Sequence, residues 1–395
     1  MTMGEVRLSP KGFQWWRTGH PWVFASDVAQ EDGEATAPVR VLGPDGRVLG
    51  VASYSPASQI RLRILSRKTE WPGFTELVQE RIRTALARRR PLDPVTDAQR
   101  LISAEADGLP GLIVDAYGEL LVAQITTPLL EARRDLIRRI LCEARPLRML
   151  LARNRLPVRA REGLPQEDEL LAGERVERCE VQERGLVFEV LPFAGQKTGL
   201  FLDQRPARGR VRQRAGERAG DWLDLCSYQG AFALSALAGG AASALAVDVS
   251  ASALELAQRS AERNGLSGLE CQRGDVFSVL EELGRSGRRF DGIIVDPPAF
   301  ARSRRELSLA RKAYGRLNRL AFGLLREGGL AFSCSCSQHM RPELFAQMLG
   351  EAAAAAGRRL FDRGRLAPAL DHPVLLGFPE GEYLKSHELE DVGVP

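Results

Sequence analysis

The chain has 395 residues, which is too long for one ordinary domain, so we expect two or three. A content of 44% hydrophobic and 27% charged residues is typical of a soluble globular protein, and no run of about 18 apolar residues predicts a membrane span. The first residues, M-T-M-G-E-V-R, lack the apolar core of a signal peptide, so we expect a cytoplasmic enzyme. The net charge of +4 is too small to indicate nucleic-acid binding by itself.

The six cysteines are scattered along the chain and predict no disulfide framework. Cys334, Cys336 and His339 lie close enough in sequence to suggest metal ligands. A structural zinc site needs a fourth ligand at suitable spacing, which the sequence does not offer, so we predict no metal.

Residues 1–70 are expected to form a small β domain. Strand-like segments at Val39–Leu42, Val48–Tyr54 and Ile60–Leu65 are separated by turns rich in Gly, Pro, Asp and Ser. Basic and aromatic residues are interleaved around them, as in RNA-binding barrels that contact phosphates and stack bases. Trp22 and Phe24 are better explained as barrel core. The candidates for RNA contact are Lys11, Trp15, Arg61 and Arg63.

Residues 71–185 predict a central α+β domain. Helical periodicity covers Phe74–Arg90 and Leu129–Cys142, and the arginines that end the first helix are explained by the helix dipole alone. Strand-like segments occur at Arg100–Ser103, Leu112–Ala116, Leu120–Thr126 and Leu147–Ala152, and around Glu174–Val181. No catalytic constellation appears in this part, so we expect it to act as a spacer or to position RNA.

Residues 186–395 have the pattern of an α/β domain that binds a nucleotide. Trp222–Phe232 reads W-L-D-L-C-S-Y-Q-G-A-F, a strand followed by a tight loop and a helix. Small loop residues let a ligand approach the backbone, but Gly230 is the only glycine near the turn, so this loop alone is weak evidence.

Four more strands in this part end in polar residues. Ala244–Val247 ends in Asp248, which would reach a ribose diol, and the third strand ends before Asp275 and Val276, which suit an adenine ring. The fourth ends in D-P-P-A-F (296–300) and the fifth in S-C-S-C (333–336). Each acid alone could be a helix cap. Together they predict a Rossmann-like, seven-stranded class I S-adenosylmethionine (SAM) methyltransferase domain, completed by strands near 359–365 and 382–386.

The chain also resembles a known family, the bacterial large-subunit rRNA cytosine-C5 methyltransferases with an N-terminal PUA domain. The similarity covers nearly the whole chain. It is carried by H-P-W-V-F (20–24), S-P-A-S-Q-I-R (55–61), D-G-L-P-G-L-I-V-D (107–115), K-T-G-L-F-L-D-Q-R (197–205), C-S-Y-Q-G-A-F, D-P-P-A-F, F-S-C-S (332–335), D-H-P-V (371–374) and P-E-G-E-Y-L-K (379–385). The resemblance implies a PUA domain, a central α+β domain and a SAM domain, with 23S rRNA as the partner.

Position by position, the resemblance implies a set of site residues. Those that would bind SAM are Gln204, Asp224, Cys226, Ser227, Tyr228, Gly230, Asp248, Asp275, Val276 and Asp296. Pro297, Pro298 and Phe300 would lie beside the base, and Cys334 would be the nucleophile with Asp296 as its catalytic partner. Two positions depart from relatives: Ala299 replaces a lysine found in some, and Cys336 stands where some have glycine, which offers a rival thiol.

A thiol suits the chemistry that this resemblance implies. Carbon 5 of cytosine is a poor nucleophile, and it is activated when a thiolate adds at carbon 6 of a flipped base. Asp296 could hold the base near N3 as charge develops, and a base that the sequence does not identify must remove the carbon 5 proton.

Two other functions remain open at this point. A related rRNA family shares the T-G-L-F-L-D, S-Y-x-G and D-P-P segments but methylates a guanine nitrogen and needs no thiol. A non-catalytic RNA-binding assembly factor that keeps SAM only structurally is the other. The sequence predicts no membrane partner and leaves the oligomeric state open, a homodimer included.

Overall fold

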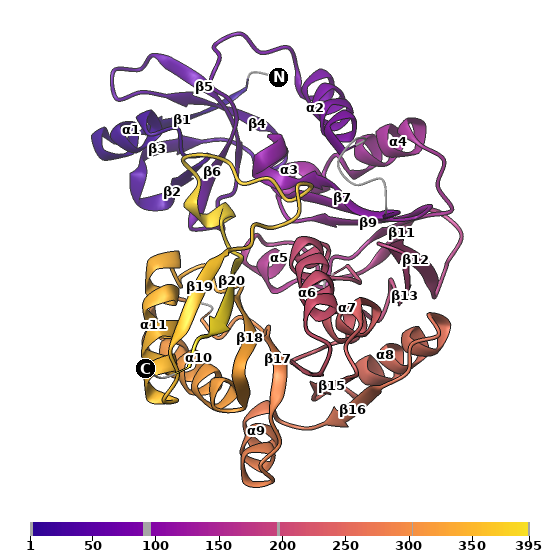
Figure 1. Ribbon diagram of the computed structural model, residues 1–395. Helices are drawn as coiled ribbons and strands as arrows, with labels where there is room; N and C mark the ends of the chain where they lie inside the picture. The colour runs from indigo at the N-terminus through magenta and orange to yellow at the C-terminus, as the bar shows by residue number, and fades with distance from the viewer. Residues whose placement is uncertain (1–2, 90–95, 196–197, 302, 394–395) are drawn as a thin grey trace. The chain divides into compact units, whose positions relative to one another are not determined.

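The computed structural model describes residues 3–89, 96–195, 198–301 and 303–393. The chain divides into two compact units, of which the first comprises residues 1–181, 190–202 and 370–381 and the second comprises 182–189, 203–369 and 382–395. Figure 1 shows the elements along the chain. The predicted helix end at Arg90 and the Lys197 of the K-T-G-L-F-L-D-Q-R segment lie outside the described residues.

The N-terminal part of the first unit is a six-stranded sheet with the order β2-β6-β5-β4-β1-β3. The strands are β1 (Gly4–Leu8), β2 (Trp22–Phe24), β3 (Val28–Asp32), β4 (Pro38–Leu42), β5 (Val48–Tyr54) and β6 (Ile60–Ser66). Val6, Val41 and Leu62 contribute to its buried core. The small β fold predicted for this part is therefore confirmed, and its boundary at residue 70 stays a prediction.

The helix α1 (Pro10–Arg17) is a feature that the sequence did not predict. Ser9 caps it by accepting a hydrogen bond from the Gly12 backbone N–H at 3.0 Å. A glycine inside a helix normally weakens it. Here a Cβ on residue 12 would lie 2.0 Å from the Asp27 carbonyl oxygen, so only glycine permits this close packing.

A five-stranded sheet with the order β11-β10-β9-β8-β7 follows. Its strands are β7 (Ala98–Ser103), β8 (Leu112–Tyr117), β9 (Leu120–Ile125), β10 (Met149–Ala152) and β11 (Glu169–Gly173). The helix α2 (Phe74–Arg89) packs on this sheet, and the helix predicted at 129–142 is divided into α3 (Pro128–Glu131) and α4 (Arg134–Ala144). The short helix α5 (Pro157–Arg161) follows β10.

The second unit contains a seven-stranded sheet, as predicted. Its order is β16-β15-β14-β17-β18-β20-β19, and β20 runs antiparallel to both of its neighbours. The strands are β14 (Asp221–Leu225), β15 (Ser243–Asp248), β16 (Leu269–Arg273), β17 (Phe290–Val295), β18 (Leu325–Ser335), β19 (Leu360–Arg365) and β20 (Lys385–Asp391). The last strand begins at Lys385 rather than at Glu382. Two further strands, β12 (Cys179–Glu183) and β13 (Leu186–Val190), pair with each other.

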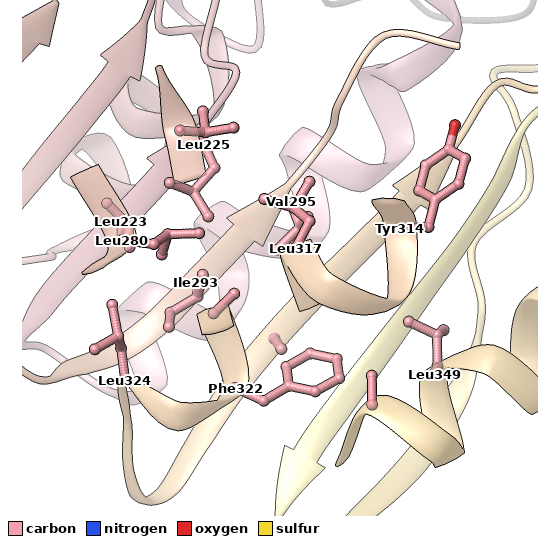
Figure 2. Packing of buried hydrophobic residues seen from close by; sticks show 14 of the residues in the cluster. Leu223, Leu225, Leu280, Ile293, Val295, Tyr314, Leu317, Phe322, Leu324 and Leu349 are labelled. Atoms are coloured by element: carbon pink, nitrogen blue, oxygen red, sulfur yellow. The ribbon is translucent and has the colours of Figure 1, made fainter. Parts of the chain in front are cut away.

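Helices cover both faces of this sheet (Figure 1). One face packs against α9 (Val276–Arg285), α10 (Leu307–Gly323) and α11 (Pro342–Ala355), and the other against α6 (Arg205–Glu217), α7 (Ala231–Gly239) and α8 (Ala251–Arg263). Figure 2 shows Ile293 and Val295 of β17 in the cluster that also holds Leu317 and Phe322 of α10. None of the helices in the described residues is long and apolar enough to cross a membrane.

Candidate active site

The loop after β14 holds its backbone in an unusual conformation. Cys226 and Tyr228 have φ angles of 59° and 50°, which non-glycine residues seldom adopt, and Gly230 has a φ of 68°. A Cβ on Gly230 would lie 2.8 Å from the Cβ of Ala257 in α8. Strained residues of this kind gather at ligand sites. The sequence predicted a tight loop here but not the positive φ angles of Cys226 and Tyr228.

Asp224 lies at the carboxyl end of β14 and is 1% exposed. Its Oδ2 accepts a hydrogen bond from the Ala233 backbone N–H at 3.0 Å, and its Oδ1 has no hydrogen-bond partner among the residues that the structure describes. Burial, together with the nearby charges of Asp296 and Asp248, raises the pKa of Asp224 well above its ordinary value. This buried acid therefore has a free oxygen with which to bind a polar ligand.

Asp248 ends β15 and connects two loops. Its Oδ2 accepts from the Tyr228 backbone N–H at 2.8 Å, and its Oδ1 accepts from the Ser250 backbone N–H at 2.9 Å. These two bonds fix the orientation of the carboxylate while leaving lone pairs on both oxygens.

Asp275 is the N-cap of α9, so the cap interpretation applies to this acid. Its Oδ1 accepts from the backbone N–H groups of Phe277 at 3.1 Å and Ser278 at 3.2 Å. The side chain is exposed, and Val276 beside it is buried. The second oxygen, Oδ2, takes no part in these bonds.

Several buried polar atoms near this loop lack partners among the described residues. They are Gln204 Oε1, Asp224 Oδ1, Ser227 Oγ and Gln229 Nε2. A buried polar atom without a partner is costly, and a bound polar ligand would satisfy it. The charges of Asp248 and Asp296 add to the effect of burial in raising the pKa of Asp224. Burial, together with the charges of these acids, also raises the pKa of the Cys226 thiol. Free hydrogen-bonding atoms and negative charge fit the adenosine and the cationic sulfonium of SAM.

The D-P-P-A-F segment follows β17. The Asp296 backbone N–H donates to the Leu225 carbonyl at 3.4 Å, which joins the segment to the end of β14. Pro297 is buried and Pro298 is exposed. The Phe300 ring lies 4.6 Å from that of Tyr314, whose hydroxyl Figure 2 shows at the rim of the core cluster.

Cys334 lies at the carboxyl end of β18 and is fully buried. Its Sγ is 3.2 Å from Ser386 Oγ. Burial, together with the Asp296 charge, raises its pKa well above the ordinary value, so the thiol is protonated in the protein alone. Cys336, two residues further on, is half-buried.

Lys385 is a residue of this region that the sequence analysis missed. It is 1% exposed, and its Nζ donates to the carbonyls of Ser337 and Tyr383, each at 2.6 Å. Burial lowers its pKa to about 8, although the nearby Cys336 opposes this effect. Ser337 Oγ in turn accepts from the Ala301 backbone N–H at 3.2 Å and lies 3.0 Å from the Tyr314 hydroxyl. The segments after β17 and β18 are thereby joined.

The four N-terminal candidates have different environments. Lys11 is exposed and pairs with Asp27 at 2.9 Å, and Trp15 donates from Nε1 to the Trp22 carbonyl at 3.0 Å. Arg61 pairs with Glu31 at 3.2 Å and is mostly buried.

Arg63 is buried and pairs with Glu162 at 2.6 Å, so contact with RNA would require that ion pair to open. Trp22 and Phe24 are half-buried, lie in an aromatic cluster with Trp15 and His20, and do not belong to the buried core. The core interpretation of these two residues therefore holds only in part.

No group of three or more His, Cys, Asp or Glu side chains in the described part of the chain is arranged to hold a metal ion.

The chain is similar to known proteins over most of its length. Residues 6–67 match the model of the PUA-like domain, and residues 116–372 match the S-adenosylmethionine-dependent methyltransferase model. The ribosomal RNA large subunit methyltransferase I of Alteromonas mediterranea is 37% identical over 387 residues, which cover 96% of this chain and 97% of that protein. The proteins of the same name from Aeromonas salmonicida and Escherichia coli are 37% and 36% identical, each covering 93% of this chain and 94% of the relative.

Solved structures agree on the fold. A methyltransferase complexed with SAH has a TM-score of 0.86 at 22% identity, covering 98% of this chain and 100% of that one. A SAM-dependent methyltransferase from Streptococcus mutans has a TM-score of 0.84 at 21% identity with the same coverage. The chain therefore belongs to the family of ribosomal RNA large subunit methyltransferase I, and it is a SAM-dependent methyltransferase with an N-terminal PUA-like domain.

Proposed function

We propose that this protein methylates carbon 5 of a cytosine in large-subunit ribosomal RNA through a covalent bond between Cys334 and the base. The observation that carries the proposal is the Cys334 thiol at the carboxyl end of β18, close enough to Asp296 for that charge to raise its pKa. Methylation of a guanine nitrogen needs no thiol at this position, whereas addition at carbon 6 of cytosine does.

The first step joins Cys334 to the base. Because the thiol is protonated in the free protein, a base must take its proton, and Asp296 is the nearby carboxylate. The sulfur then bonds to carbon 6, and the electrons of the double bond between carbons 5 and 6 become available at carbon 5. The proton now on Asp296 can be donated to N3 of cytosine, where negative charge develops.

The second step transfers the methyl group. When bound, SAM would supply it: the electron pair at carbon 5 would bond to the methyl carbon as the bond from that carbon to the sulfonium sulfur breaks, which leaves S-adenosylhomocysteine. Asp224, Asp248 and the atoms without partners around them would hold the cofactor in place. A base then removes the carbon 5 proton, the double bond re-forms, and the bond between carbon 6 and Cys334 breaks. The proton on N3 returns through Asp296 to the released thiolate, so that 5-methylcytosine leaves and the thiol is restored.

The remaining candidates would hold the RNA. Pro297, Pro298 and Phe300 follow Asp296 directly and would border the flipped base. Lys11, Trp15 and Arg61 of the PUA-like domain would contact phosphates and bases elsewhere on the RNA, since such contacts add affinity without chemistry.

Trapping the adduct tests this function. With rRNA that carries 5-fluorocytidine, carbon 5 has no proton to lose, so a methylated adduct should accumulate and survive denaturing electrophoresis. The wild type and Cys336→Ala should trap it, and Cys334→Ala should neither trap it nor methylate cytosine.

The opposite pattern, with trapping by Cys334→Ala but not by Cys336→Ala, would make Cys336 the nucleophile. Full methylation by the double variant would exclude the covalent mechanism and favour guanine as the target. Absence of methyl transfer to any rRNA would support a non-catalytic assembly factor.

A further inference from the structure

A groove of about 450 Å³ lies between α10 and α11 in the second unit. The two helices lie next to each other on the same face of the seven-stranded sheet (Figure 1). The α10 side of the groove presents four cationic side chains, Arg311, Lys312, Arg316 and Arg319. The residues that line it from α11 include a single acid, Glu351.

The cations of the groove differ in how they are held. Arg311 donates to both oxygens of Glu351, at 2.6 and 2.7 Å, and Arg316 pairs with Glu281 of α9 at 2.8 Å. Lys312 and Arg319 are exposed and form no ion pair with any described residue. Four cations therefore face one carboxylate within the groove, and two of them are available to an anionic partner.

The spacing of Lys312 and Arg319 suits a chain of phosphates. The two residues are seven positions apart on α10, which places them on one face and roughly 10 Å apart along the helix. Gly315 lies between them, and Met348 and Ala352 face it from α11, so the floor of the groove is small and apolar. A positively charged groove is how proteins follow the backbone of a single nucleic-acid strand. The described residues that line this groove include no aromatic side chain for base stacking, so it suits contacts to phosphates alone.

The groove lies between two helices that each begin at the edge of the sheet where the candidate site lies. The helices α10 and α11 follow the parallel strands β17 and β18, so both begin at the sheet edge that carries Asp296 and Cys334. The segment that leads into α10 is held there by the bond from the Ala301 backbone N–H to Ser337 Oγ. A strand whose target base occupies the site could continue along this groove.

We propose that the groove between α10 and α11 binds the phosphodiester backbone of the substrate RNA on one side of the target nucleotide. Lys312 and Arg319 contact phosphates, and Arg311 and Arg316 add positive charge at fixed positions. The identification of the partner as RNA rests on the proposed function. The groove and its excess of positive charge are observed independently of that function.

A salt titration of RNA binding tests this proposal. The variant Lys312→Gln/Arg319→Gln is compared with wild type on a 23S rRNA transcript at several salt concentrations. Each lost phosphate contact should reduce the slope of log affinity against log salt by about 0.7 to 0.9, so the variant should lose roughly 1.4 to 1.8. The KM for RNA should rise, while kcat at saturating RNA and the affinity for SAM stay unchanged.

The matched control is Arg285→Gln/Arg359→Gln, which removes two exposed charges at the opposite edge of the same sheet and should keep the wild-type slope. An unchanged slope and KM in the groove variant would overturn the proposal. It would also be overturned if an acidic peptide occupied the groove of the wild type and left the affinity for RNA unchanged.

The two proposals fail separately. If the groove variant has a smaller salt slope than wild type but the wild type does not methylate cytosine, only the proposed function is refuted. If the wild type methylates cytosine but the two slopes are equal, only the proposed role of the groove is refuted.

Discussion

Asp248 Oδ2 accepts a hydrogen bond from the backbone N–H of Tyr228 at 2.8 Å, so the end of β15 supports the loop after β14. Tyr228 is one of the loop residues with a positive φ, at 50°. The same carboxylate that would meet the ribose therefore also stabilises the backbone on which the cofactor would rest.

Replacing Asp248 with Ala should weaken SAM binding at least about tenfold, the scale of one lost charge-assisted hydrogen-bond pair. Asp248→Asn keeps one acceptor for the Tyr228 N–H and should lose less. Titration calorimetry measures both. Equal affinity in wild type and Asp248→Ala would remove this residue from the ribose role.

Gly230→Ala should lower both stability and SAM affinity. A residue with a side chain is strained at the φ of 68°, and the added Cβ would lie 2.8 Å from Ala257 Cβ. Gly265, with a φ of 62° and no atom within 4 Å of an added Cβ, provides the control for strain alone, about 1 to 2 kcal/mol. Thermal unfolding should show Gly230→Ala as the more destabilised variant. Equal losses would mean that Ala257 moves aside.

Lys385 should make stability depend on pH. Its pKa is lowered by burial to about 8 in the folded protein, below the ordinary 10.5, so between these values the unfolded chain binds more protons. Stability should therefore rise with pH across that window, by up to about 1.4 kcal/mol per pH unit from this group.

In Lys385→Met this contribution is absent, and denaturant unfolding at pH 8, 9 and 10 compares the two proteins. A difference in stability between wild type and variant that stays constant with pH would mean that the folded amine titrates normally.

Lys11→Gln should weaken rRNA binding and reduce its salt slope by about 0.7 to 0.9, because one phosphate contact is lost. Arg47→Gln removes an exposed charge from the same domain and serves as the control. Point variants are preferable to deletion of the domain, since deletion would leave the buried Glu162 without Arg63. Identical slopes for Lys11→Gln and wild type would exclude Lys11 from the contact.

The centre of the seven-stranded sheet could be predicted from the sequence because β14, β15, β17 and β18 contain apolar segments that end in recognisable polar residues. The small helix α1 could not, because its Gly12 is required by the Asp27 carbonyl that lies against it, and this contact is tertiary. The break between α3 and α4 within the helix predicted at 129–142 was also not predicted, because Ala132 and Arg133 both suit a helix.

At the site, the positions of the acids at strand ends could be predicted, and their roles toward SAM stay predictions. The environment of Cys334 could not, because it depends on Ser386 of a strand that lies 52 residues further along the chain. Lys385 appeared only as the last residue of P-E-G-E-Y-L-K, and its burial could not be predicted, because a lysine near a strand end is expected in solvent. In the fold it is buried and pairs with Ser335 of β18.

The position of β20 between β18 and β19 has a consequence for how the protein is made. As the chain leaves the ribosome, β14 to β18 can pair with one another in turn, but β19 emerges before the strand that must separate it from β18. Until Lys385–Asp391 has been synthesised, β18 is an exposed edge that carries Cys334, and β19 has no neighbour in the sheet. We therefore expect that, until β20 pairs with β18, the edge of the sheet that carries Cys334 stays uncovered.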